Sequence, residues 1–171
     1  MLIRQELPAD IPAVRAVTAA AFATKDGSEP VEAWLLDELR VSDGWLPALS
    51  LVAEDADGEV VGHVVCTRGD VAGAPALGLG PLSVRPGDQR RGVGLALMHA
   101  VLGAADALGE PLVVLLGDPR YYGRYGFVAA AELGIEAPDP NWTSAFQARP
   151  LTAYEPGLKG RFAYAEPFRR L

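Results

Sequence analysis

The sequence predicts a mixed α/β domain in which a twisted sheet is flanked by helices. Apolar residues recur at helical spacing in three segments, and short apolar or alternating runs typical of strands lie between and after them. Asp57-Gly58 separates two of these runs, and both residues tolerate the positive φ of a tight hairpin turn. Alternating helices and strands with an early hairpin are typical of a mixed sheet.

The N-terminal third predicts a strand, two helices and the hairpin. Leu2–Leu7 alternates weakly as an opening strand, and Asp10 offers an N-cap for the helix that follows. The apolar stripe of that helix is Ile11, Val14, Val17 and Ala21. A second helix is expected to start near Ser28-Glu29-Pro30, with inward-facing Val31, Trp34, Leu35 and Leu39. The two hairpin strands are expected at Leu49–Glu54 and Val60–Cys66.

The middle of the chain predicts an irregular strand followed by a long helix. Leu77–Val84 reads as a strand but contains Gly78, Gly80 and Pro81, and a proline cannot donate to a strand ladder. We therefore expect this strand to bulge or splay and to leave backbone groups free on one side. The helix is expected over Val93–Leu108, with Val93, Leu97, Val101, Ala105 and Leu108 on one face.

The C-terminal part predicts further strands around a short helix. Leu112–Leu116 is a continuous apolar run, as expected for a strand covered on both faces. A tyrosine-rich helix is expected around Arg120–Tyr125, and a strand near Phe127–Ala130. One or two strands are expected in the tail, around Ala145–Leu151 and Arg161–Ala165. No repeat or linker divides the chain, so residues 1–171 are expected to form one domain.

Composition excludes several classes of protein. The formal net charge of −7 argues against general nucleic-acid binding, which needs clustered Lys and Arg. The N-terminus has charges where a signal peptide needs an apolar run, and no stretch approaches the ~20 apolar residues of a membrane span. The single Cys66 rules out an internal disulfide framework. We therefore expect a cytoplasmic protein without nucleic-acid or membrane partners.

The segment from Gly78 to Leu102 contains the strongest chemical signal. An irregular strand leads into a basic, glycine-bearing turn that opens directly into a helix. The first N–H groups of a helix lack intrahelical acceptors, and with the helix dipole they form an anion site suited to a phosphate. Gln89, Arg90 and Arg91 add donors and charge beside it. A P-loop would need Gly-Lys-Ser/Thr here, and a dinucleotide fingerprint would need a third glycine; the chain has neither.

Residues 89–94, Gln-Arg-Arg-Gly-Val-Gly, match the Q/R-x-x-G-x-G/A signature, and the sequence resembles the GNAT acetyltransferase superfamily. A strand ending in Leu-x-Val-x-Pro precedes the signature, and Tyr-Tyr-Gly-Arg-Tyr-Gly-Phe, residues 121–127, follows one strand later. The similarity extends over roughly residues 1–150 in element order and is most specific from 78 to 130. It implies the GNAT fold, in which a splayed central strand pair forms the acyl-CoA site.

The resemblance also implies roles for individual residues. Main-chain N–H groups of Gln89, Arg90, Arg91, Gly92, Val93 and Gly94 would hold the pyrophosphate of coenzyme A. Leu82, Ser83 and Val84 would pair with the pantetheine arm, and a backbone N–H there would polarise the thioester carbonyl. Tyr122 aligns with the general acid that protonates the departing thiolate. Asp118 stands where many relatives carry Asn, so a contact made by that Asn is in doubt.

The remaining candidates are weighed against structural roles. Tyr121 and Tyr125 share a helical face and are assigned to packing, and Cys66 to an inert buried thiol. A proton acceptor for the amine is required, but the sequence selects none among Glu29, Glu32, Glu54, Asp118 and His63. His63 is interpreted as structural, and Glu29 and Glu32 as members of a solvated helix face. No cluster has metal-ligand spacing, so no metal is expected.

The resulting hypothesis is an N-acetyltransferase that moves an acetyl group from acetyl-CoA to a primary amine by direct attack. The alternative is a non-catalytic acyl-CoA-binding regulatory module of the same fold. The tail from about residue 141 is expected to complete the sheet and the acceptor pocket. Protein N-termini, polyamines, aminoglycoside-like compounds and amino acids all stay open as acceptors. The oligomeric state also stays open, and a homodimer is one possibility.

Overall fold

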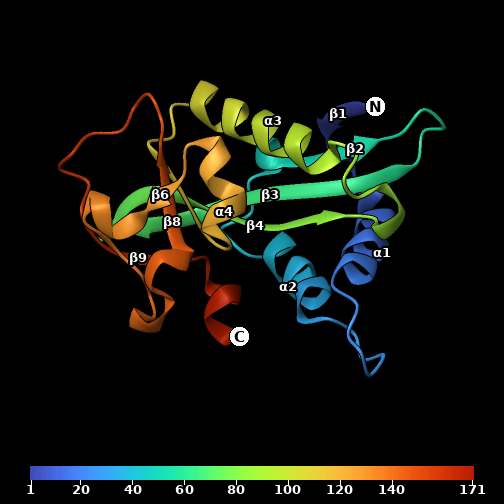
Figure 1. Cartoon of the computed structure of the whole chain (residues 1–171), viewed down its shortest axis with the longest axis horizontal. Coiled ribbons are helices and arrows are strands. Elements are labelled where there is room, and N and C mark those ends of the chain that lie inside the picture. The colour runs from blue at the N-terminus through green and yellow to red at the C-terminus, as the bar shows by residue number, and fades with distance from the viewer.

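The computed structural model describes all of residues 1–171 and contains one mixed sheet with helices on both faces (Figure 1). The central strands follow the order β1-β2-β3-β4-β5-β8-β6, and β9 joins both β3 and β7. The β4–β5 and β7–β9 pairs are parallel and every other pair is antiparallel. The strands are β1 Leu2–Gln5, β2 Ser50–Glu54, β3 Val60–Val71, β4 Ala74–Val84, β5 Leu112–Leu116, β6 Val128–Ala129, β7 Ile135–Glu136, β8 Phe146–Pro150 and β9 Gly160–Ala163.

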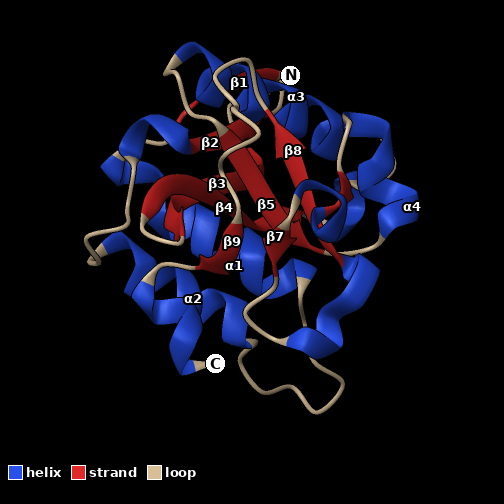
Figure 2. Cartoon of the chain, turned by 90° about the vertical axis from the view of Figure 1, so that its left-hand side faces the viewer, coloured by secondary structure: helices blue, strands red, loops and turns tan.

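The long helices lie on opposite faces of this sheet. Helix α3, Val93–Ala107, covers one face, and α1, Ile11–Ala21, with α2, Val31–Arg40, covers the other (Figure 1). The short helix α4, Pro119–Tyr122, follows β5 and continues into a 3-10 turn over Gly123–Tyr125. In the view of Figure 2 the strands gather in the middle of the molecule with the helices around them. This is the helix-flanked mixed sheet that the sequence predicts.

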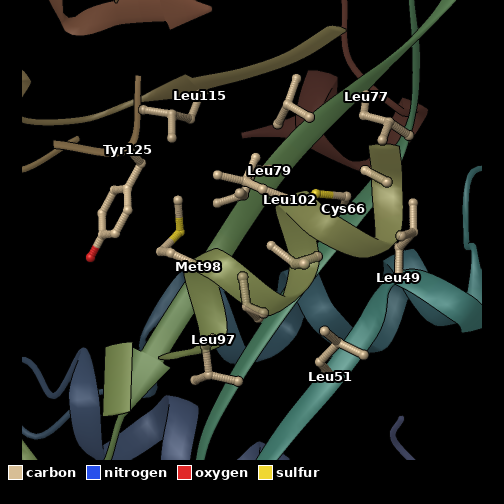
Figure 3. Packing of buried hydrophobic residues seen from close by; sticks show 14 of the residues in the cluster. Leu49, Leu51, Cys66, Leu77, Leu79, Leu97, Met98, Leu102, Leu115 and Tyr125 are labelled. Carbon is tan, nitrogen blue, oxygen red and sulfur yellow. The ribbon is translucent and has the colours of Figure 1, made fainter. Parts of the chain in front are cut away.

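The largest apolar cluster lies between α3 and the sheet (Figure 3). Leu97, Met98 and Val101 of α3 are fully buried in it against side chains from β2, β3, β4 and β5. Cys66 is buried in the same cluster, and this burial raises the pKa of its thiol well above the ordinary value. The helical stripe of α3 that the sequence predicts is therefore the main contact between this helix and the sheet.

Strand β4 departs from β5 partway along its length, as its glycines and proline predict. It pairs with β3 from Ala74 to Val84 with one irregularity. Its pairing with β5 is confined to Leu77 opposite Val113 and Gly78 opposite Val114. Beyond Gly78 the two neighbours separate, and one edge of β4 is no longer paired with a strand. This separation positions the candidate site.

Several boundaries and exposures differ from the sequence-based expectation. Strand β3 continues five residues past Cys66 to Val71, because its second half pairs with β4 and β9. Strand β7 is only two residues long, too short for a periodic pattern to reveal. Val31 and Leu108 were expected to face inward, but they lie at helix ends and are 50% and 58% exposed.

None of the helices has the length and apolar character needed to cross a bilayer.

Candidate functional site

A groove of about 620 Å³ lies at the N-terminal end of α3. We call it the α3 groove; its walls include Leu82–Val84 of β4, Gln89, Arg90, Gly92 and Gly94 of the turn, and Tyr121, Arg124 and Tyr125 after β5. The unpaired part of β4 and the turn before α3 therefore line the same groove, although residues 85–88 separate them in sequence. The structure assembles in one place most of the residues that the sequence singles out.

The turn before α3 presents backbone donors that have no partner in the protein. Arg90 and Gly92 adopt positive φ, +62° and +84°, which only glycine adopts readily. The first backbone donor in the helix is Ala96, whose N–H donates to the Gly92 carbonyl at 3.0 Å. The N–H groups from Arg90 to Leu95 make no such bond. With the dipole of a 15-residue helix behind them, they form an anion site.

The side-chain charges around the α3 groove are positive. Arg90 and Arg124 line it and no Asp or Glu does, although the chain as a whole carries a net charge of −7. The Arg124 guanidinium stacks 4.8 Å from the Tyr121 ring centroid, and its Nε donates to the Tyr121 carbonyl at 3.0 Å. Arg91 is exposed beside the groove but does not line it. Arg124 was not singled out from the sequence, because only the tyrosines of residues 121–127 were assigned roles there.

The three β4 residues present different groups to the groove. Leu82 is half-buried at its wall, whereas Ser83 is buried and shares a 3.1 Å hydrogen bond with Thr18 of α1. The side-chain amide of Gln89 donates to the Val84 carbonyl at 3.1 Å and so ties the turn to the end of β4. Val93 is buried in the core, so only its backbone is available to a ligand.

A second cavity of about 650 Å³ adjoins the α3 groove, because Phe22 and Leu82 line both. We call it the apolar cavity. It opens where β4 and β5 separate, and Leu79, Leu115 and Leu116 form part of its wall. Its other wall comes from the C-terminal tail, with aromatic side chains at Trp142, Phe162, Tyr164 and Phe168. The tail also supplies β8, which pairs with β5 along its whole length.

Tyr122 lies in the wall of the apolar cavity. Its ring packs on Gly117 so closely that a Cβ there would lie 2.5 Å away, and it meets the Tyr121 ring edge-on at 4.8 Å. The hydroxyl makes no hydrogen bond within the protein and is not among the enclosed unpartnered atoms. Burial, with a smaller effect from Tyr121, raises the pKa of Tyr122 to about 12. The phenol is therefore protonated at neutral pH and free to donate.

Tyr121 and Tyr125, the two tyrosines nearest to Tyr122 in sequence, have different surroundings. Tyr125 is buried in the core, as the sequence-based assignment to packing predicts, and its hydroxyl donates to the Tyr121 hydroxyl at 2.9 Å. Tyr121 has a role beyond packing, because its ring carries the guanidinium of Arg124 and lines the α3 groove. A Cβ on Gly94 would lie 3.1 Å from its hydroxyl oxygen.

Most of the candidate proton acceptors that the sequence could not choose among have partners elsewhere in the protein. Asp118 caps α4 through the Arg120 N–H at 2.9 Å and pairs with the Arg120 side chain, which accounts for an aspartate at this position. Glu29 pairs with Arg15 at 2.6 Å. Glu54 pairs with Arg4 at 2.7 Å, and His63 is fully buried beside Ser50.

Glu32 is the exception among these candidates. It was expected on a solvated helix face with Glu29, but it is half-buried and lines the apolar cavity. The reason is that the C-terminal tail packs beside α2, which no local pattern in α2 predicts. No His, Cys, Asp or Glu side chains gather in a group that could hold a metal ion.

Comparisons with known proteins agree with this geometry. The family model for the acetyltransferase (GNAT) domain matches residues 3–130. The N-acetyltransferase YhbS of Escherichia coli K12 is 38% identical over 175 residues, covering 99% of each chain. The N-acetyltransferase YjhQ of the same strain is 33% identical over 162 residues, covering 90% of this chain and 86% of the relative.

Two solved structures show the same fold over nearly the whole chain. The crystal structure of YhbS from Escherichia coli in complex with CoA has a TM-score of 0.89 at 34% identity, covering 99% of this chain and 92% of that chain. A GNAT family acetyltransferase from Brucella melitensis in complex with acetyl-CoA has a TM-score of 0.79 at 36% identity, covering 98% and 97%. The family model, the full-length relatives and these structures agree with the motif, and the chain belongs to the GNAT family of acetyltransferases.

Proposed function

We propose that this protein transfers the acetyl group of acetyl-CoA to a primary amine by direct attack, with Tyr122 as the general acid. Two relatives that share this fold over nearly their whole length were solved in complex with CoA and with acetyl-CoA, which supports this cosubstrate. The α3 groove suits it chemically, because unpartnered N–H groups and two arginines face a space without acidic side chains.

In this proposal the N–H groups of residues 90–94 bind the pyrophosphate, and Arg90 and Arg124 add charge beside it. The Gln89 N–H, which the sequence analysis expected to join them, donates instead to the Pro86 carbonyl at 3.5 Å. The pantetheine arm follows the edge of β4 at Leu82–Val84 that β5 leaves unpaired. A backbone N–H on that edge donates to the thioester oxygen as negative charge develops there. The acceptor reaches the thioester from the apolar cavity, which adjoins the groove at Leu82.

The reaction forms one bond and breaks another. The neutral amine nitrogen bonds to the acetyl carbon, the carbon–sulfur bond breaks, and the sulfur takes a proton from the Tyr122 hydroxyl. The nitrogen loses one proton to solvent water, and the Tyr122 phenolate regains a proton from solvent. Tyr122 carries the proposal: it lines the cavity that adjoins the α3 groove at Phe22 and Leu82, and its protonated hydroxyl makes no hydrogen bond within the protein. A thiol of ordinary pKa about 8.5 is a tolerable leaving group, so the acid accelerates the step without being indispensable.

The test is Tyr122→Phe, which keeps the ring on Gly117 and removes only the proton donor. We expect kcat to fall about 10²-fold, the lower end for general acid catalysis. Acetyl-CoA affinity measured by calorimetry should change little, because the donor acts in the transition state. Tyr154→Phe is the matched control, since Tyr154 is half-buried and lines neither space.

Equal kcat for wild type and Tyr122→Phe would refute the assignment of Tyr122. Failure to acetylate any amine in a broad panel, with acetyl-CoA still bound, would instead identify a non-catalytic acyl-CoA-binding module.

A further inference from the structure

We propose that the acceptor is a primary monoamine carried on an apolar, aromatic body. This inference rests on the proposed function and specifies its substrate class. The apolar cavity carries it, because its volume of about 650 Å³ falls within the range of small-molecule sites, roughly 300–1,000 Å³.

The walls of this cavity are mainly hydrophobic. Fourteen of its 21 lining residues are hydrophobic, so a polar acceptor would lose hydration without gaining partners. One wall is an aromatic cluster in which Tyr164 meets Phe162 and Phe168 at ring-centroid distances of 4.8 Å and Trp142 at 6.3 Å. Aromatic rings prefer edge-to-face and offset contacts at such distances, so this wall suits an aromatic acceptor.

The charged residues of the cavity limit the acceptor to one ammonium group. The acidic ones are Glu32 and Asp139, and the side chain of Asp139 already accepts the Asn141 N–H at 2.9 Å. Glu32 is half-buried and makes no ion pair. Arg161 and Arg169 also line the cavity and would repel further positive charge. A polyamine or an aminoglycoside would place several cations against two carboxylates and two arginines, a set of side chains with no net negative charge.

The wall is a fixed part of the fold. The 3-10 helix Glu166–Arg170 brings Phe168 to the cavity, and Arg170 of this helix pairs with Glu38 of α2 at 2.8 Å. The Arg170 guanidinium also lies 5.2 Å from the Trp34 ring centroid. An acceptor therefore meets a preformed apolar surface and does not have to order it.

The first test compares kcat/KM for phenethylamine, ethanolamine, spermidine and kanamycin with acetyl-CoA. Burial of the phenyl ring should favour phenethylamine over ethanolamine by about ten- to a hundredfold. Spermidine and kanamycin should be poorer acceptors than phenethylamine. A preference for either polycation, or for ethanolamine, would overturn the inference while leaving the proposed acetyl transfer intact.

A binding measurement separates the two proposals. With CoA saturating, phenethylamine should quench the fluorescence of Trp142, and Trp142→Phe should abolish that change. Quenching without turnover of any amine would support the acceptor class and contradict the acetyl transfer. No quenching with the wild type would overturn the inference.

Variants of the wall complete the test. Leu116→Asn alters a side chain that is 46% exposed at the end of β5, and should lower kcat/KM for phenethylamine about tenfold with little effect on ethanolamine. Val41→Asn is the control, because Val41 is 82% exposed and lies outside the cavity. Glu32→Gln should weaken phenethylamine binding severalfold, whereas Glu132→Gln, at an exposed residue outside the cavity, should not. Equal effects of Leu116→Asn on both amines would contradict the apolar recognition.

Discussion

Arg124 is expected to contribute to coenzyme A binding, although it lies outside the signature of residues 89–94. Its guanidinium is held over the Tyr121 ring and by the Tyr121 carbonyl, so it is ordered before a ligand arrives. It lines the same groove as the unpartnered N–H groups of the turn before α3. Arg124→Ala should therefore weaken CoA binding without disturbing the core.

The size of this effect follows from screened electrostatics. Two unit charges about 4 Å apart in water interact by about 1 kcal/mol, which corresponds to about fivefold in Kd. A pyrophosphate carries more than one negative charge, so we expect a five- to tenfold rise in Kd at about 0.1 M salt. At about 1 M salt, where the Debye length is about 3 Å, the difference should fall below about twofold. Arg124→Lys should be intermediate, because it keeps the charge but loses the stacking on Tyr121.

Isothermal calorimetry with CoA at both salt concentrations measures these effects, and Arg120→Ala is the control. Arg120 lies four residues earlier, its side chain is 91% exposed, and it pairs with Asp118 away from the groove. Equal Kd values for wild type and Arg124→Ala at low salt would refute the reasoning. So would a loss of the same size in Arg120→Ala, which would indicate a general effect of net charge.

Two further predictions concern the turn and the core. Gly92→Val should weaken CoA binding, because Gly92 has a φ of +84° that valine does not adopt without strain. Gly94→Val should weaken it because the added Cβ would lie 3.1 Å from the Tyr121 hydroxyl oxygen. Unchanged Kd values in calorimetry would contradict both predictions. Cys66 should resist alkylation by iodoacetamide in the folded protein and react after unfolding in urea, because burial removes access and raises its thiol pKa. Mass spectrometry after brief labelling measures this, and labelling of Cys66 under native conditions would contradict the prediction.

Most of the fold could be predicted because its signals are local. The stripe of α3, the Asp57-Gly58 turn and the apolar run of β5 are each read within one element, and the structure contains all three. The separation of β4 from β5 was also predictable, because Gly80 and Pro81 oppose regular pairing on both sides. The candidate phosphate site followed from the same kind of signal, a glycine-bearing turn before a helix.

The apolar cavity could not be predicted in the same way. Phe22, Glu32, Leu116, Trp142 and Phe168 come from five separate segments, and only the packing of the C-terminal tail beside α2 and β5 brings them together. Each of them reads locally as an ordinary core or surface residue. Glu32 shows the consequence, because its environment depends on a segment more than a hundred residues away.

A buried polar cluster that includes Arg40 of α2 was also hidden from sequence patterns. His63 is fully buried, its Nε2 lies 2.8 Å from the Ser50 hydroxyl and 3.7 Å from a Glu6 carboxylate oxygen, and its Nδ1 has no partner. Arg40 lies 2.6 Å from the other oxygen of Glu6. Burial lowers the pKa of His63, and the charge of Arg40 adds to this, despite the opposing effect of Glu6. A proton on Nδ1 would have no acceptor, so the neutral imidazole is the stable form.

The state of His63 makes stability depend on pH in a defined window. Below the ordinary histidine pKa of 6.5 the unfolded chain binds a proton that the folded chain does not, so stability must fall as pH falls. The slope approaches about 1.4 kcal/mol per pH unit for one proton.

Burial opposes ionisation of Glu6, but hydrogen bonds outweigh this and lower the pKa of Glu6 to about 2, so its contribution is lost only below its ordinary value of 4.5. Because Glu6 in the unfolded chain begins to take up protons about one pH unit above 4.5, urea unfolding between about pH 6.5 and 5.5 isolates His63. His63→Gln should flatten the dependence of the unfolding free energy on pH there, whatever its effect on stability at pH 7. His99→Gln should retain the slope, because His99 is exposed at the surface of α3. An unchanged slope in His63→Gln would show that the folded protein accepts the proton, and that the buried cluster accommodates a second positive charge beside Arg40.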